Sequence, residues 1–106
     1  HRDYEHGYQS YPCLFMPNEV SPDSINEINS KRNRWMDDLQ KAGISTRPAT
    51  HAVHMLSFYK EKYKLQPSDF PSAYAADHCS LSLPLFPGMS NAEQDFVIEK
   101  VLEYKN

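Results

Sequence analysis

The side chains best suited to bind a ligand lie close together in the middle of the chain, at Arg47, Thr50, His51 and His54. Arg47 stands directly before Pro48, at the expected end of a short strand. A guanidinium in that place can hold a phosphate or a carboxylate through two parallel hydrogen bonds. The alternative for Arg47 is a surface arginine that pairs with a nearby acid. The sequence therefore predicts an anion site here without excluding an ordinary ion pair.

The two histidines of this stretch, His51 and His54, are three residues apart, so a helix would place both imidazoles on one face. Two histidines supply half of the ligands that a structural zinc site needs. Asp77, His78 and Cys79 are further candidate ligands, but three consecutive residues cannot all point inward from one helix. A metal site stays an alternative, beside a core histidine that bonds to a backbone carbonyl.

The chain shows none of the common motifs for phosphate binding or acyl transfer. Its three glycines, at positions 7, 43 and 88, are too widely separated for a phosphate loop, and no serine stands in a nucleophile elbow. The lysines occupy exposed-looking helical or terminal contexts, with no motif for a cofactor lysine. Helix caps and ion pairs, and not paired-carboxylate catalysis, explain the aspartates Asp37, Asp38, Asp69 and Asp77.

The composition limits the classes of partner. The 106 residues carry a formal net charge of −3, which does not favour broad attraction to the phosphates of nucleic acids. No apolar run approaches the roughly 20 residues that a membrane-spanning helix needs, and no secretory signal is visible. Cys13 and Cys79 are expected to be reduced, part-buried thiols. We therefore expect a cytoplasmic protein without a nucleic-acid or membrane partner.

The elements that must position the candidate site begin with a strand and a long helix. Tyr11–Met16 is an apolar run of strand length, closed by a proline. Ser24 with Glu27 fits a capping box at a helix start, and Gly43 suits the left-handed conformation that ends a helix. A break near Asn29–Ser30 is an alternative to one continuous helix. The apolar face holds Ile25, Ile28, Trp35, Leu39 and Ala42, and the polar face is expected to hold Lys31, Arg32, Arg34, Asp37 and Asp38.

Shorter elements follow in the second half of the chain. The sequence Asp69-Phe70-Pro71 is a helix start, with the proline where its missing N–H costs nothing. Ser90 with Glu93 forms a second capping box, which opens a final helix through Leu102. The remaining predicted elements are a strand at Ile44–Arg47, a helical period through His51–Tyr63, a short helix through Ala73–Ala76 and a strand at Leu81–Leu85.

This order of elements predicts an α+β fold: a small two-layer sandwich with a short, mainly antiparallel three-stranded sheet and helices packed on one side. The length supports one domain over residues 1–106. Residues 1–9 are expected to be a tail from a preceding domain. Because residue 1 is His1 and not methionine, we expect the chain to begin inside a longer reading frame or after processing.

Two longer motifs carry a resemblance to a known family. The first runs from Gly43 to His54 and reads Gly-Ile-Ser-Thr-Arg-Pro-Ala-Thr-His-Ala-Val-His, and the second is Leu-Ser-Leu-Pro-Leu-Phe-Pro-Gly-Met-Ser at Leu81–Ser90. The pair resembles the C-terminal end of the DegT/DnrJ/StrS family, pyridoxal-phosphate aminotransferases that act on nucleotide-linked keto sugars. The resemblance extends from roughly Tyr8 to Leu102. The Thr-Arg-Pro variant at Arg47 resembles the perosamine-synthase-like branch most closely.

The resemblance implies a division of labour between two domains. In this family the cofactor lysine, and the aromatic residue and aspartate that grip the pyridine ring, belong to a large N-terminal domain. The present chain would be the C-terminal small domain, which binds no pyridoxal phosphate itself and contributes a wall of the substrate pocket and part of a homodimer. The parent enzyme would transfer an amino group, from glutamate, to a keto sugar for a surface polysaccharide.

The same resemblance assigns expected roles to the candidate site. Arg47 would face the mouth of the active site, and His54, at the family's histidine spacing, would donate to a sugar hydroxyl. Thr50 and His51 would add to the pocket wall, but Ala49 and Thr50 are small where many relatives carry bulky residues, which implies a roomier pocket or one filled from elsewhere. Leu81–Ser90 would be structural. Two alternatives remain open: a free-standing interaction module without catalysis, and a small histidine-based metal-binding protein.

Overall fold

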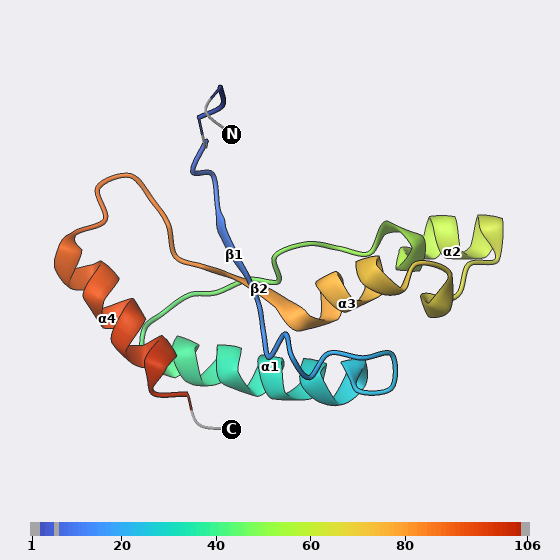
Figure 1. Cartoon of the computed structure of the whole chain (residues 1–106), viewed down its shortest axis with the longest axis horizontal. Coiled ribbons are helices and arrows are strands. Elements are labelled where there is room, and N and C mark those ends of the chain that lie inside the picture. Colours follow the sequence, from blue (N-terminus) through green and yellow to red (C-terminus); the bar gives the residue numbers. More distant parts are fainter. Residues whose placement is uncertain (1–2, 6, 105–106) are drawn as a thin grey trace.

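A computed structural model of the chain describes residues 3–5 and 7–104, which form four α-helices, two 3₁₀ helices and two strands (Figure 1). Residues 1, 2 and 6 of the predicted tail at 1–9 lie outside the described residues. The strands cross in the middle of the molecule, α1 runs beneath them, α4 lies at one end, and α2 with α3 lies at the other. The α+β class predicted from the sequence is confirmed.

The sheet has two antiparallel strands, β1 (Tyr11–Leu14) and β2 (Ser80–Leu83), with Tyr11 opposite Leu83. The prediction of a third strand at Ile44–Arg47 was wrong, because this segment meets β2 only at one isolated bridge, between Arg47 and Ser82. Two features limit the pairing. The N–H of Ile44 is used in the helix end before it, and Pro48 has no N–H to donate.

Helix α1 (Ile25–Lys41) is one continuous helix, without the alternative break near Asn29–Ser30. The capping box predicted for Ser24 and Glu27 was wrong, because neither side chain caps the helix. The Ser24 hydroxyl donates to the carbonyl of Glu19 at 2.6 Å and accepts from the N–H of Ser21 at 2.8 Å. Glu27 instead forms an ion pair with Lys31 at 2.8 Å. The turn before the helix therefore uses the hydroxyl that the cap would need.

The C-terminal end of α1 follows the predicted glycine cap. Gly43 has φ of +87°, and its N–H donates to the carbonyl of Gln40 at 3.0 Å. The next N–H, of Ile44, reaches back to the carbonyl of Leu39 at 2.8 Å. This pair of bonds is a Schellman motif, and the side chains of Ile44 and Leu39 both enter the core cluster, as this motif favours. The end of α1 thereby directs the chain toward the Arg47 bridge.

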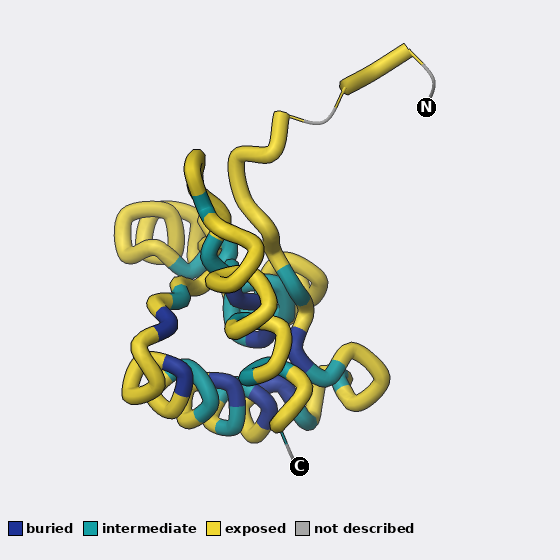
Figure 2. Tube along the Cα trace, turned by 90° about the vertical axis from the view of Figure 1, so that its left-hand side faces the viewer, coloured by how far each residue is buried: buried dark blue, intermediate teal, exposed yellow. Residues whose placement is uncertain are grey.

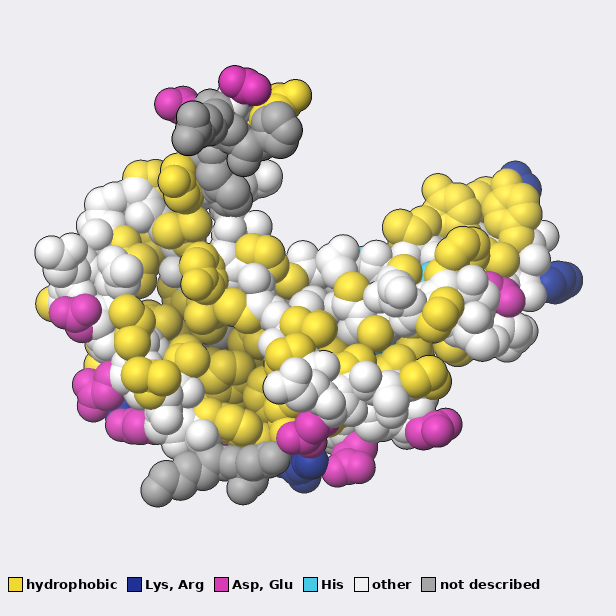
Figure 3. Space-filling view, in the orientation of Figure 1, with side chains coloured by type: hydrophobic (Ala, Val, Ile, Leu, Met, Phe, Trp, Pro, Cys, Tyr) yellow, Lys and Arg dark blue, Asp and Glu magenta, His cyan; other side chains and the backbone are white. Residues whose placement is uncertain are grey.

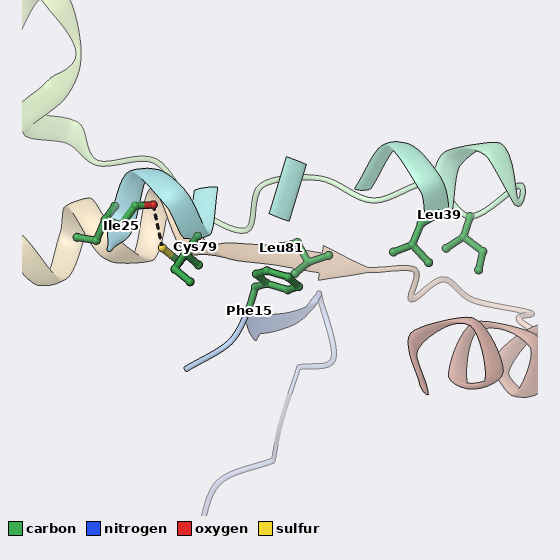
Figure 4. Packing of buried hydrophobic residues seen from close by; sticks show 7 residues of the cluster. Phe15, Ile25, Leu39, Cys79 and Leu81 are labelled. Atoms are coloured by element: carbon green, nitrogen blue, oxygen red, sulfur yellow. Dashed lines mark hydrogen bonds between the residues drawn. The ribbon is translucent and has the colours of Figure 1, made fainter. Parts of the chain in front are cut away.

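The core lies between α1, the strands and the C-terminal end of α3 (Pro71–Cys79). Figure 4 shows Phe15 and Leu81 near each other and the Cys79 thiol turned toward Ile25, whose carbonyl is 3.9 Å away. Neither cysteine is in a disulfide, and burial raises the pKa of both thiols, so they are protonated at neutral pH. The buried members of the core cluster are Phe15, Ile25, Ile28, Leu39, Ile44, Cys79 and Leu81.

The short helices match their predicted starts in two places. Pro71 occupies the first turn of α3, and the capping box of α4 (Asn91–Leu102) is present, since Glu93 N–H donates to the Ser90 hydroxyl and Ser90 N–H to the Glu93 carboxylate. The helical period predicted through 51–63 is divided by Leu56, whose backbone is extended. The pieces are the 3₁₀ helix η1 (Val53–Met55) and α2 (Ser57–Tyr63), followed by the 3₁₀ helix η2 (Pro67–Asp69).

The molecule is open. Its radius of gyration is 15.9 Å, against about 13 Å for a compact domain of about 100 residues. Figure 2 shows buried residues concentrated along α1 and where the strands cross, while the described N-terminal segment leads away from the body. Among residues 3–5 and 7–104, no helix has both the length and the apolar character needed to cross a membrane.

We expect Gly43→Ala to lower the free energy of unfolding by about 1 kcal/mol, because an L side chain is strained at this positive φ. An added Cβ would meet no atom within 4 Å, so the loss would come from the backbone alone. Urea denaturation measures it, and Gly43→Asn is the control, since asparagine tolerates this conformation better. Equal stability of wild type and the alanine variant would contradict the cap.

Candidate functional site

The segment 47–54, which carries all four candidate residues, is held to the rest of the molecule near both of its ends. At the first anchor, the Ser82 N–H donates to the Arg47 carbonyl at 2.7 Å, and the Arg47 N–H donates to the Ser82 carbonyl at 3.4 Å. The Arg47 side chain is exposed and forms no ion pair with any residue that the structure describes. The backbone is thus fixed while the guanidinium stays available to an anion.

At the second anchor, Asp77 of α3 accepts the N–H of Ala52 through its carboxylate Oδ2, at 2.9 Å. Ala52 is 1% exposed, so its backbone is fixed inside the molecule. Between the anchors, Thr50 and His51 are exposed and Ala49 is half-buried. The two anchors therefore leave a short exposed arc, residues 48–51, with Arg47 at its start.

His54 does not share this exposed arc. It is 6% exposed, its ring lies 5.1 Å from the ring of Phe70, and its Nε2 is buried without a hydrogen-bond partner among the described residues. The structure thus brings Arg47, Thr50 and His51 to one exposed stretch and separates His54 from them. Phe70 is itself 52% exposed, so it is a thin cover over the imidazole.

Arg32 was wrongly expected on the polar face of α1, and it is 5% exposed. Its Nη1 donates to the carbonyl of Ser80 at 2.6 Å and to that of Asp77 at 3.5 Å, at the C-terminal end of α3. Burial lowers the pKa of Arg32, and the charge of Asp77 opposes that shift. The signal that could have found it is spacing, since Ile25, Ile28 and Arg32 follow one another at three- and four-residue steps.

Arg32 is one of four donors at this end of α3. An α-helix leaves its last four carbonyls without partners inside the helix. Here each of them accepts a hydrogen bond from a side chain or from the backbone of another segment. The donors are Ser80 Oγ to Ala76, Arg32 Nη1 to Asp77, Asn29 Nδ2 to His78 at 2.8 Å, and the Phe15 N–H to Cys79 at 2.7 Å.

A groove of about 530 Å³ lies between β1, the segment 83–89 and α4. Its walls are mostly apolar, as the hollowed, hydrophobic face in Figure 3 also suggests, and none of the four candidate residues lines it. The groove residues include Tyr11, Leu83, Phe86, Val97 and Val101. The candidate site is therefore a surface stretch and not this groove.

Comparison with known sequences decides the family. Residues 19–102 match the profile of the DegT/DnrJ/EryC1/StrS aminotransferase family. The chain belongs to this family. The match includes both motifs on which the resemblance was based, and the aminotransferases of the family depend in general on pyridoxal phosphate. No solved structure matches the chain significantly.

Three relatives match the chain, and the first two support the family assignment. The chain is 31% identical to GDP-perosamine synthase of Escherichia coli over 76% of its length, and 41% identical to the spore coat polysaccharide biosynthesis protein SpsC of Bacillus subtilis over 46%. It is 25% identical to an uncharacterized protein of Methanocaldococcus jannaschii over 92% of its length. The alignments span 20%, 13% and 23% of these relatives, so the chain covers less than a quarter of each.

The described lysines of this family member do not fit a cofactor site. A lysine that bonds to pyridoxal phosphate needs a neutral amine, which proteins favour by desolvation or by a nearby positive charge. Lys62 lies over the rings of Phe58 and Tyr63 on the exposed helix α2, where Lys60 is also exposed. In three further cases a hydrogen bond to an acid raises the lysine pKa instead: Lys31 to Glu27, Lys41 to Asp38 and Lys100 to Glu103.

The histidines at positions 51, 54 and 78, which the structure describes, also lack the neighbours of a metal centre. No group of three or more His, Cys, Asp and Glu side chains in the described part of the chain is placed to hold a metal ion. His51 is exposed, His54 is buried beside Phe70, and the Nδ1 of His78 lies 3.1 Å from the carbonyl of Tyr74. These positions give the alternative of a histidine-based metal site no support from geometry.

We predict that the 106-residue chain, titrated with an equal concentration of pyridoxal phosphate, gives no absorbance band of a lysine adduct. The reason is that its described lysines are charged or exposed, as given above. An intact family enzyme serves as the positive control. A stoichiometric band that one Lys→Ala substitution removes would contradict the prediction.

A second prediction concerns the buried imidazole. His54→Leu should leave the free energy of unfolding unchanged or raise it, because a buried polar atom without a partner costs about 1–3 kcal/mol. His54→Ala is the matched control and should lose about 2 kcal/mol or more through the cavity that it leaves. Thermal and urea denaturation measure both. A large loss in the leucine variant would mean that Nε2 has a partner.

Proposed function

We propose that this chain is the C-terminal small domain of a pyridoxal-phosphate-dependent aminotransferase that acts on nucleotide-linked keto sugars. The observation that carries the proposal is the family match over residues 19–102. The domain contributes a wall of the substrate pocket and part of the dimer structure, and a large N-terminal domain supplies the cofactor lysine. The product of the whole enzyme is an amino sugar for a surface polysaccharide.

The names of the relatives support the substrate class. One is a synthase of a GDP-linked sugar, perosamine, and another takes part in spore coat polysaccharide biosynthesis. Both are several times longer than the region they share with this chain. A nucleotide-linked sugar carries a diphosphate, which an arginine binds well through charge-assisted hydrogen bonds.

The apolar surface supports a role inside a larger assembly. Phe58, Tyr63 and Leu102 are 65%, 57% and 77% exposed, and apolar side chains cover much of the face in Figure 3. Contiguous exposed apolar surface of this kind is typical of contacts with other domains or subunits. We assign it to the large domain and to a second subunit of a homodimer.

The exposed arc between the two anchors is the part of the pocket wall that we assign to the substrate. Arg47 lies on a fixed backbone with its guanidinium exposed, which suits it to an anionic group of the substrate. Thr50 and His51 can offer a hydroxyl and an imidazole beside it, and Ala49 and Thr50 leave space for a sugar ring. His54 reaches a sugar hydroxyl only if Phe70 moves aside when the substrate binds.

In the full-length enzyme, we predict that Arg47→Ala lowers kcat/KM for a GDP-linked keto sugar by roughly ten- to a hundred-fold. Loss of a hydrogen bond to a charged group costs about 1.5–3 kcal/mol, which corresponds to that range. Arg47→Lys should restore only part of the loss, because it cannot form two parallel bonds. His54→Ala should cost less than Arg47→Ala, since it would meet a neutral hydroxyl.

Two controls accompany this measurement. The visible absorbance of the bound cofactor should be the same in wild type and variants, because the cofactor belongs to the other domain. The melting temperature should also stay close to that of wild type in Arg47→Ala, since only an exposed side chain is lost. Full activity together with a melting temperature several degrees lower would make the residue structural and remove the pocket-wall assignment.

A further inference from the structure

We infer that Asp77 is the positioning residue that sets the place of the exposed arc 48–51, acting through the backbone N–H of Ala52. The inference rests on the proposed function, because it explains how the arc assigned to the substrate is held. Asp77 itself contacts no substrate in this account. Its hydrogen bond joins two segments that are 25 residues apart in sequence.

Both anchors of the arc come from one continuous piece of the chain. Asp77 lies in the last turn of α3, and that helix passes directly into β2, which carries Ser82. Asp77 holds the arc at Ala52 by its carboxylate, and Ser82 holds it at Arg47 by its backbone. The spacing of the two anchors is therefore fixed by the helix-to-strand junction and not by the arc itself.

The two anchors differ in what maintains them. The bond at Ser82 is between backbone groups, so truncating a side chain does not remove it. The bond at Ala52 has a side-chain acceptor, and a carboxylate accepts an N–H more strongly than a neutral oxygen does. Ala52 is 1% exposed, and a buried N–H that loses its acceptor costs free energy. The position of the arc thus depends on one carboxylate.

The position of that carboxylate is in turn fixed from α1. Arg32 donates to the carbonyls of Asp77 and Ser80, and Asn29 donates to the carbonyl of His78. These bonds hold the residue that carries the carboxylate and the first residue of β2. The positive charge of Arg32 also lies at the negative end of the α3 dipole, where a cation is favourable. Asp77 therefore projects from a turn that α1 holds by three hydrogen bonds.

Loss of the carboxylate should release one end of the arc while the other end stays bound. The Arg47 bridge would remain, but residues 49–52 would sample more conformations before the substrate binds. Substrate binding would then include the cost of ordering them, which raises KM and leaves the chemical step unchanged. An asparagine in place of the aspartate keeps an oxygen in the same place and should retain most of the effect.

The experiment compares Asp77→Ala and Asp77→Asn in the full-length protein, with Asp37→Ala on the exposed side of α1 as a control for lost charge. Hydrogen exchange followed by mass spectrometry measures the peptide that covers residues 49–54. Steady-state kinetics with a GDP-linked keto sugar measure KM and kcat. We expect faster exchange in that peptide and a roughly ten-fold higher KM, with kcat within about two-fold, in Asp77→Ala only.

The two readouts separate this inference from the proposed function. Unchanged exchange at 49–54 in Asp77→Ala would overturn the inference, as would equal defects in the alanine and asparagine variants or faster exchange throughout the protein. A normal KM in Asp77→Ala, when Arg47→Ala raises it, would also overturn it. Faster exchange in Asp77→Ala together with a normal KM in Arg47→Ala would support the anchor and overturn the pocket-wall assignment.

Discussion

The structure depends on how the C-terminal end of α3 is satisfied. A helix end inside a protein exposes four carbonyls that cost free energy if they find no partner. In this chain α1 supplies two of the donors, Arg32 and Asn29, and the first residue after β1, Phe15, supplies a third. One helix end thus joins the long helix, the first strand and the second strand. The apolar core forms around the same point, where Cys79 and Leu81 are fully buried.

This constraint also explains where the candidate site lies. The segment 47–54 attaches on both sides of the junction between α3 and β2. Asp77 binds it before the junction and Ser82 binds it after the junction. A loop with few apolar contacts of its own gains a defined shape in this way. Arg47, Thr50 and His51 stay exposed on this segment, so their polar groups face solvent without loss of the core. In the function that we propose, the binding groups lie on a loop and the scaffold beneath it provides the order.

The open shape follows from the same architecture. With a sheet of two short strands, the fold has few places to bury the apolar residues of α2 and α4, and several of their aromatic and aliphatic side chains are exposed. Helix α4 contributes Val97 to the edge of the core and leaves Phe96 and Ile98 exposed. Under the function that we propose, a large domain and a second subunit would cover this surface.

The sequence by itself determined the family, the α+β class and most helix boundaries, because these depend on local signals. The glycine at position 43, the proline at 71 and the pair Ser90 and Glu93 act within one turn of chain, and the structure uses them as the pattern predicts. Where a local signal had a competitor, it failed. Ser24 looked like a cap, but the preceding turn takes its hydroxyl.

Only the tertiary structure decided which polar residues are buried and what they hold. Arginine is usually a surface residue. The role of Arg32 depends on the end of α3, which is 45 residues away in sequence and lies beside it in the fold. The bond from Ala52 to Asp77 and the burial of His54 depend likewise on segments brought together by folding. The third strand was lost for a local reason instead, since the N–H of Ile44 bonds within the end of α1 and Pro48 has no N–H to donate. Patterns along the chain record propensity, whereas the partners of a buried polar group are fixed by distance in space.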